Sequence, residues 1–320
     1  MKRKTPIARH PDADRIRARL LRGIAGNRIA GLHFPGYFLD IEWEEITGDS
    51  ARIAIADGPH CRNASGEVDI AALGILTDTA LATTTRRGIT PGAWLATTIH
   101  LQMQLTGAPA TGSISASARL LDFSAGSALR QLLCSAVLSA RGQPVCHASG
   151  EFVLFDPPPG VKFGPLPWLH AAPPQIAPVE ESALDPRERA ILKACDGALA
   201  KASPQAAFIQ HFWGGAPKYT AHGASNRVAI GAHLCNRVGD VQGGILFGIA
   251  AHTAAAAVPA GMMLSNVSAW YIGPGRGKAL AVKSRVVHAG RTIAVVRTEI
   301  KTSSGKRVLE AVTHHVAKAR

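Results

Sequence analysis

Two related stretches decide the fold of this chain, and they stand 173 positions apart. The first reads His60-Cys61-Arg62-Asn63-Ala64-Ser65-Gly66-Glu67-Val68-Asp69. The second reads His233-Leu234-Cys235-Asn236-Arg237-Val238-Gly239-Asp240-Val241-Gln242-Gly243-Gly244. Each leads into an apolar run, and the first run carries an acid, Asp78, where the second has Ala251. Because internal repetition marks duplicated structural units, the chain is predicted to contain two copies of one fold.

The segments around the two stretches follow one order, which is a strand, a long helix and then a meander of four strands. For the first half we expect a helix over 12–23, strands over 38–46 and 52–56, the long helix over 68–85, and strands over 94–105, 113–121, 128–139 and 145–155. For the second half we expect helices over 186–201 and 241–258, and strands over 227–232, 264–272, 279–288, 292–302 and 307–317.

Prolines mark the boundary between the two units. They are dense between 156 and 186, and a run so rich in proline suits neither a central strand nor a helix interior. We therefore divide the chain into a basic N-terminal arm over 1–25, a first unit over 26–156, a linker over 157–186 and a second unit over 187–320.

Charge is unevenly distributed, because nearly half of the net charge of +13 lies in the first 22 residues. Clustered Lys and Arg can bind nucleic acid or an anionic membrane. The arm lacks the interleaved aromatic residues that base stacking uses, which favours a solvated helix. No nucleic-acid partner is expected.

The five cysteines are odd in number and contain no CxxC pair, which favours free thiols in a reducing compartment, the cytoplasm. The start of the chain has no apolar signal region. The most apolar stretch, 245–264, includes His252, Thr253 and Pro259, so a buried helix is favoured over a membrane span.

A long helix wrapped by an antiparallel meander and entered through a Gly-rich turn resembles the hotdog fold. This implies an α+β protein of two fused hotdog domains, paired as a pseudo-dimer. More narrowly, Asn236-x5-Gln242-Gly243-Gly244 resembles the acyl-CoA thioesterase branch related to the phenylacetyl-CoA thioesterases. That branch has Asn, then His-Gly-Gly, then an acid nine residues after the His.

Each copy departs from this pattern in a different place. The second copy has Gln242 for the His and Ala251 for the acid. The first keeps Asn63 and the acid Asp78 but has Asp69-Ile70-Ala71 in place of His-Gly-Gly.

Helix geometry explains how two incomplete copies can form one site. Nine residues of helix rise about 13 Å, so the start of a helix and an acid further along it cannot meet on one carbonyl. In the fold that the chain resembles, the long helices lie antiparallel and each site takes one part from each unit. The resemblance implies one competent site, from Asn236, Gln242, Gly243, Gly244 and Asp78, and one pseudo-site, from Asn63 and Asp69 opposite Ala251.

Thioester hydrolysis fits these residues. A backbone amide of Gly243 or Gly244 at a helix start would bind the developing oxyanion. Asp78 would act as a general base on water or as a nucleophile, with burial raising its pKa. Asn236 and Gln242 would orient the carbonyl or the water.

Further substrate contacts are expected nearby. Thr97, or Thr98 as the alternative, would hold the water beside Asp78. Four basic residues near the later strands would bind the phosphates of coenzyme A, a polyanion that suits the basic chain: Arg276, Lys278, Arg291 and Lys306. No cofactor or metal is expected, since coenzyme A enters as part of the substrate.

Other functions remain as alternatives. A non-catalytic acyl-CoA or lipid sensor would explain why Gln242 replaces the His and why one acid is lost. An interaction protein could dock through the basic arm. Hotdog hydratases are disfavoured, because the Asp and His pair that they carry at the start of the long helix is absent. Double units of this kind also associate further, so a homo-oligomer is an open expectation.

Overall fold

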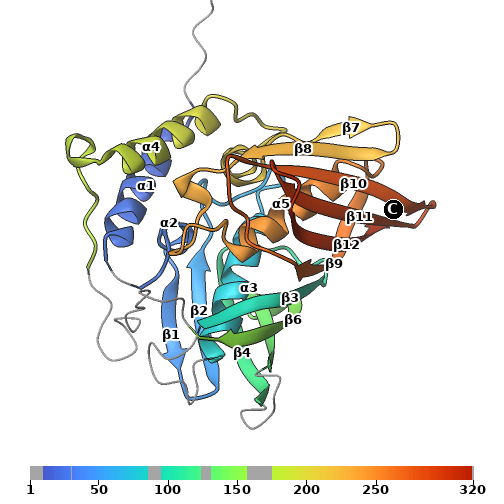
Figure 1. Cartoon of the computed structure of the whole chain (residues 1–320), viewed down its shortest axis with the longest axis horizontal. Helices are drawn as coiled ribbons and strands as arrows, with labels where there is room; N and C mark the ends of the chain where they lie inside the picture. The colour runs from blue at the N-terminus through green and yellow to red at the C-terminus, as the bar shows by residue number, and fades with distance from the viewer. Residues whose placement is uncertain (1–9, 30, 86–94, 124–130, 157–174, 319–320) are drawn as a thin grey trace, which may run out of the picture.

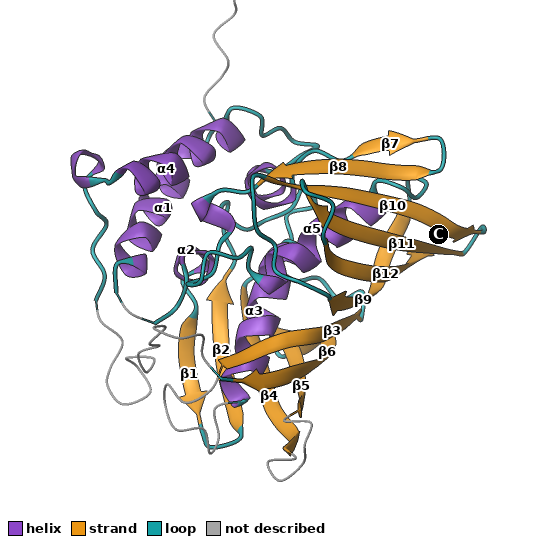
Figure 2. Cartoon of the chain, viewed as in Figure 1, coloured by secondary structure: helices purple, strands orange, loops and turns teal. Residues whose placement is uncertain are grey.

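A computed structural model describes residues 10–29, 31–85, 95–123, 131–156 and 175–318. Most of the proposed linker, 157–174, lies outside the described residues, as do the first nine residues of the proposed arm. Within the described part, the two units form a continuous antiparallel sheet with helices on its concave side (Figures 1 and 2).

The first unit contains α1 (Ala13–Asn27), α2 (Phe34–Leu39) and the long helix α3 (Ile70–Thr84). Its strands are β1 (Glu42–Ile46), β2 (Ser50–Ala56), β3 (Leu95–Leu105), β4 (Ser113–Phe123), β5 (Gln131–Ala140) and β6 (Gln143–Phe155).

The second unit repeats this order with α4 (Pro186–Leu199), a short π-helix (Gln210–Gly214) and the long helix α5 (Gly243–Ala255). Its strands are β7 (Lys218–Thr220), β8 (Gly223–Ala229), β9 (Met262–Tyr271), β10 (Ala279–Ala289), β11 (Ile293–Thr302) and β12 (Arg307–Ala317).

The strand order shows the duplication directly. It runs β1-β2-β4-β5-β6-β3 and then β9-β12-β11-β10-β8-β7, so the second half is the first half reversed about the junction between β3 and β9. There the two strands pair antiparallel, with Leu101 opposite Ala269 and Met103 opposite Val267. This is the arrangement of two paired hotdog units, and it confirms the predicted fold class.

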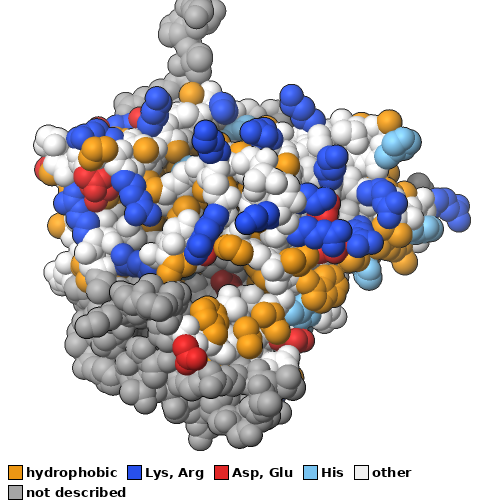
Figure 3. Space-filling view, in the orientation of Figure 1, with side chains coloured by type: hydrophobic (Ala, Val, Ile, Leu, Met, Phe, Trp, Pro, Cys, Tyr) orange, Lys and Arg blue, Asp and Glu red, His pale blue; other side chains and the backbone are white. Residues whose placement is uncertain are grey.

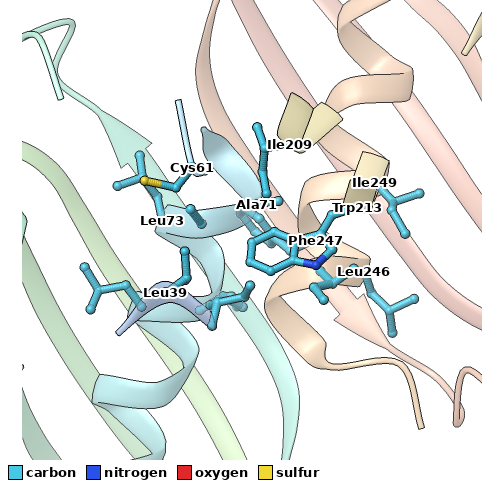
Figure 4. Close-up of a cluster of buried hydrophobic side chains, with 14 of the residues drawn as sticks. Leu39, Cys61, Ala71, Leu73, Ile209, Trp213, Leu246, Phe247 and Ile249 are labelled. Atoms are coloured by element: carbon cyan, nitrogen blue, oxygen red, sulfur yellow. The ribbon is translucent and has the colours of Figure 1, made fainter. Parts of the chain in front are cut away.

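Helices α3 and α5 pack against each other at the centre of the molecule, where glycines allow their backbones to meet. A Cβ on Gly244 would lie 2.3 Å from the backbone nitrogen of Ile75, and one on Gly248 would lie 2.3 Å from Cβ of Ala71. Both helices are buried around most of their circumference. Figure 4 shows Ala71 of α3 beside Phe247 of α5 in this core.

The described part of the basic N-terminal arm forms helix α1, which packs against α4 of the second unit. Arg17 of α1 forms ion pairs with Glu181 and with Asp196 of α4, and Arg28 binds Glu188 of α4 at 2.6 Å. A capping box of Asp185 and Glu188 starts α4 at Pro186. Arg17 of α1 and Arg28, directly after it, therefore join the first helices of the two units, α1 and α4.

The structure corrects two boundaries. The strand expected over 38–46 begins at Glu42, because residues 34–39 form a helix. Pro35 favours the start of this helix, and the side chain of His33 caps it by accepting from the amide of Gly36. The strand expected over 227–232 covers Gly223–Ala229, and the short β7 precedes it. Within the described ranges, no helix has both the length and the apolar character needed to cross a membrane.

Candidate active site

Asp78 lies on α3 and accepts hydrogen bonds from both units. Its Oδ1 accepts from the hydroxyl of Thr98 on β3 at 2.7 Å, and its Oδ2 accepts from Nε2 of Gln242 at 2.7 Å. The carboxyl group is buried, and only 8% of the residue is exposed. The structure thus brings together the acid of one copy and the helix start of the other.

Gln242 has two roles at the start of α5. Its Oε1 accepts from the amide of Ile245 at 3.0 Å and caps the helix, which leaves Nε2 facing Asp78. Since the cap fixes which end of the amide is the acceptor, Gln242 can only donate to the carboxylate.

Gly243 lies directly against this carboxylate. A Cβ at position 243 would lie 3.0 Å from Oδ2 of Asp78 and 3.4 Å from the ring of Tyr271. The hydroxyl of Tyr271 donates to the carbonyl oxygen of Gly243 at 2.9 Å. Tyr271 therefore holds the first turn of α5 in place beside Asp78.

Burial dominates the electrostatics of the site. Loss of solvation raises the pKa of Asp78 to about 6, against the opposing effect of the hydrogen bonds from Thr98 and Gln242. The pKa of Tyr271 is raised well above its usual value of 10.0, first by burial and then by the nearby Asp78. Near neutral pH, Asp78 is a carboxylate that protonates easily and Tyr271 is a hydrogen-bond donor.

The two glycines differ in their surroundings. The first amides of a helix lack intrahelical acceptors, and the Gln242 side chain satisfies only that of Ile245. Gly243 faces Asp78, while Gly244 is pressed against the backbone of Gly74 and Ile75. Gly243 thus suits an oxyanion contact better, and Gly244 primarily permits the helices to pack.

Asn63 and Asn236 lie in equivalent turns. Oδ1 of Asn63 accepts from the amides of Ser65 and Glu67, and Oδ1 of Asn236 accepts from those of Val238 and Asp240. This oxygen is therefore engaged within the turn, and no recorded bond joins Asn236 to Asp78. The structure assigns both asparagines a role in shaping the loop that leads into the long helix.

The second predicted site contains a different pair. Asp69 caps α3 through the amide of Ala71 at 2.8 Å, and its Oδ2 lies 3.0 Å from Nε2 of His252 on α5. Burial alone would lower the pKa of His252, but the Asp69 carboxylate outweighs it and the pKa is raised. Asp69 was expected to face only Ala251, and its actual partner is the residue that follows Ala251.

The other equivalents of the Asp78 site are apolar. Leu264 on β9 is the counterpart of Thr98 on β3. Thr98 directly precedes the shift of register between β3 and β6, and Leu264 directly precedes the shift between β9 and β12. Ala251 replaces Asp78. The hydroxyl and carboxylate of the first site therefore have no counterparts in the second.

The remaining predicted contacts divide into two groups. Thr98, and not Thr97, binds Asp78, because Thr97 points to the other face of β3 and is exposed. Arg276 and Lys278 lie on the loop after β9, where Arg276 pairs with Asp240. Arg291 lies in the turn between β10 and β11, about 35 Å along the strand from that loop, so it is not grouped with Arg276 and Lys278, and its phosphate contact stays a prediction.

Sequence reasoning missed Tyr271 and His252. His252 stands one position after the expected acid, and Tyr271 ends the strand after the long helix. Only the partners that these residues meet in space distinguish them from ordinary core residues.

Comparisons with known proteins bear on the fold of the chain and on one of its domains. Residues 235–316 match the family described as the acyl-CoA thioesterase N-terminal domain. A search of the curated proteins finds no match.

Solved structures resemble most of the chain. The 12:0-ACP thioesterase from Umbellularia californica is 11% identical, with 84% of this chain and 94% of that chain covered at a TM-score of 0.53. The tesB protein of Mycobacterium avium subs paratuberculosis is 11% identical, with coverage of 87% and 96% at a TM-score of 0.51. At these identities, the likeness shows the fold. The chain is therefore a double-hotdog protein whose second unit matches an acyl-CoA thioesterase domain.

Proposed function

We propose that the protein hydrolyses acyl-CoA thioesters at a single composite site, with Asp78 as the group that activates water. The observation that carries the proposal is the buried Asp78 carboxylate, hydrogen-bonded by Thr98 of its own unit and by Gln242 of the other. A buried carboxyl with a pKa of about 6 beside an open helix start is suited to proton transfer near neutral pH.

The chemistry requires one water and one thioester. The water oxygen attacks the carbonyl carbon while its proton passes to Asp78, and the carbonyl oxygen becomes an oxyanion. The amide of Gly243, at the positive end of the α5 dipole, stabilises that charge. Collapse of the intermediate breaks the carbon–sulfur bond, and the proton on Asp78 passes to the leaving thiolate.

Thr98 and Gln242 hold the carboxylate for this reaction. Each donates to a different oxygen of Asp78, so the plane of the carboxyl group is fixed and lone pairs remain for the water. Asp78 could also attack the carbonyl itself and form an anhydride, which water would then cleave. Trapping with hydroxylamine separates the two routes, because only the anhydride allows hydroxylamine to attack the Asp78 carbonyl, which releases the carboxylic acid and leaves a hydroxamate on Asp78.

The cysteines support a cytoplasmic location. All five are free and buried, which suits a reducing compartment.

The test is release of thiol from short, long and aromatic acyl-CoAs by the purified protein and by its Asp78→Asn variant. Turnover by the wild type and its loss in the variant are expected. The rival reading is a sensor that binds acyl-CoA without cleaving it, and it is kept open by Gln242 in place of the family's His. Saturable acyl-CoA binding with no thiol release on any substrate would establish the sensor instead.

A further inference from the structure

A cationic cavity lies beside the loop that is hydrogen-bonded to the segment before α5. It has a volume of about 470 Å³ and lies between the loop after β9 and the turn that joins β11 to β12. Its charged and hydroxyl-bearing lining residues are Arg276, Thr302, Ser304, Lys306 and Arg307. We call these five residues, with Lys278 next to them on the loop, the cationic rim.

The rim is joined to the residues that lead into the candidate active site. The amide of Val241, next to Gln242, donates to the carbonyl of Gly275 at 3.1 Å. Arg276 forms an ion pair with Asp240. The loop that carries the rim is therefore fixed to the residues that lead into Gln242 and Gly243.

The rim keeps a positive excess after its ion pairs are counted. Arg276 is paired with Asp240, and Arg307 with Glu299 at 3.1 Å. Lys278 and Lys306 are exposed and form no recorded ion pair within the described parts of the chain. Two lysines are thus free to bind an anion beside hydroxyl groups.

The first unit provides an internal comparison, because it has the same loop without the cations. The amide of Val68 donates to the carbonyl of Ala110, which makes the loop 106–112 the counterpart of the loop after β9. That loop reads Thr-Gly-Ala-Pro-Ala-Thr-Gly. In the turn between β5 and β6, Gln143 and Pro144 stand where the second unit has Lys306 and Arg307.

Unpaired lysines have therefore gathered beside one helix start only. It is the start that faces Asp78, whereas beside the start of α3, which faces His252, the two arginines Arg62 and Arg141 lie close to the acid Asp57. Figure 3 shows Lys and Arg over the helices α1 and α4 and over the C-terminal unit, and mainly hydrophobic and acidic side chains over the described strands of the N-terminal unit on this face.

From this asymmetry we infer that the cationic rim binds the phosphate groups of the coenzyme A nucleotide, with Lys306 and Lys278 as the principal contacts. The inference rests on the proposed function and names the group that distinguishes the substrate. A free nucleotide with a diphosphate and a 3′-phosphate fits a bounded cavity with hydroxyls, whereas an acidic carrier protein would need a broad, flat surface.

The test compares one acyl group on coenzyme A and on pantetheine, which lacks these phosphates. Lys306→Gln installs the residue of the first unit, and Lys278→Gln/Lys306→Gln removes both unpaired charges. For acyl-CoA, KM is expected to rise about tenfold in the double variant with little change in kcat. For acyl-pantetheine, KM should not change. Arg141→Gln, in the equivalent turn of the first unit, and Arg291→Gln, at the far end of β10, serve as controls and should alter neither substrate.

Calorimetric binding of coenzyme A separates this inference from the proposed function. If the wild type cleaves no thioester but binds coenzyme A about tenfold more tightly than the double variant, the hydrolase proposal fails and the rim assignment stands. Equal changes on both substrates, or no change on either, would overturn the rim assignment. So would a KM effect confined to an acyl carrier protein, which would make the rim a protein-docking surface.

Discussion

Nε2 of Gln242 donates a 2.7 Å hydrogen bond to Oδ2 of Asp78, which joins residues 164 positions apart. The donor caps the long helix of the second unit, and the acceptor lies within the long helix of the first. Neither unit contains both. The two helix starts have thus diverged. The start of α5 meets the carboxylate of Asp78, whereas the start of α3, at Asp69, meets the imidazole of His252.

The first prediction concerns the pH dependence of activity. Because the pKa of Asp78 is about 6, kcat/KM should rise with pH and level off above about pH 6 to 7. Removing a donor to the carboxylate disfavours its charged form, so in Thr98→Val the rise of kcat/KM should move to higher pH. Thr97→Val is the matched control, and its kcat/KM should rise over the same pH range as that of the wild type. Identical profiles for the Thr98 variant and the wild type would argue against Asp78 as the titrating group.

The second prediction concerns stability. Since the folded pKa of Asp78 lies above the ordinary value of 3.8, the folded state binds more protons between about pH 4 and 6, and its stability falls as pH rises through that range. The cost above pH 6 is about 3 kcal/mol. Asp78→Asn removes this cost of ionisation. The unfolding free energy of the variant minus that of the wild type should therefore increase by about 3 kcal/mol from pH 4 to pH 7. Denaturant titrations at both pH values measure this, and a constant difference would contradict the burial of an ionised Asp78.

The third prediction concerns the contact between the long helices. Gly244→Ala would place a Cβ 2.3 Å from the nitrogen of Ile75, so α3 and α5 must move apart, and a loss of about 2–4 kcal/mol of stability is expected. Gly197→Ala in α4 is the control, because a Cβ there meets nothing within 4 Å. It should stabilise the protein by about 0.5–1 kcal/mol through helix propensity. Thermal unfolding of the two variants should shift in opposite directions.

Much of the fold could be predicted from the sequence because its signals are local and occur twice. The Asn turn, the apolar helix and the meander of alternating strands are each visible in both halves. The helix over 34–39 was missed because it has six residues, too few for a periodic pattern, and only the His33 cap and Pro35 indicate it.

The site was harder to predict, because its residues are defined by contacts between units. The complementary losses, of the acid at Ala251 in the second copy and of the glycine pair at Ile70 and Ala71 in the first, pointed to a shared site. The choice between Thr97 and Thr98 depended on which face of β3 turns inward. Asp69 looked unpaired because its partner, His252, lies one residue past the position that the repeat aligns with Asp78.

The most direct test of a single composite site compares Asp78→Asn with Asp69→Asn in one thiol-release assay. Both changes replace a buried acid with its amide at the same helix interface, and Asn can still cap α3 at position 69. The account predicts that Asp78→Asn lowers kcat by about 10³-fold or more, while Asp69→Asn keeps kcat within about twofold and loses about 1–3 kcal/mol of stability. Equal losses of turnover in the two variants, or full turnover by Asp78→Asn, would contradict it.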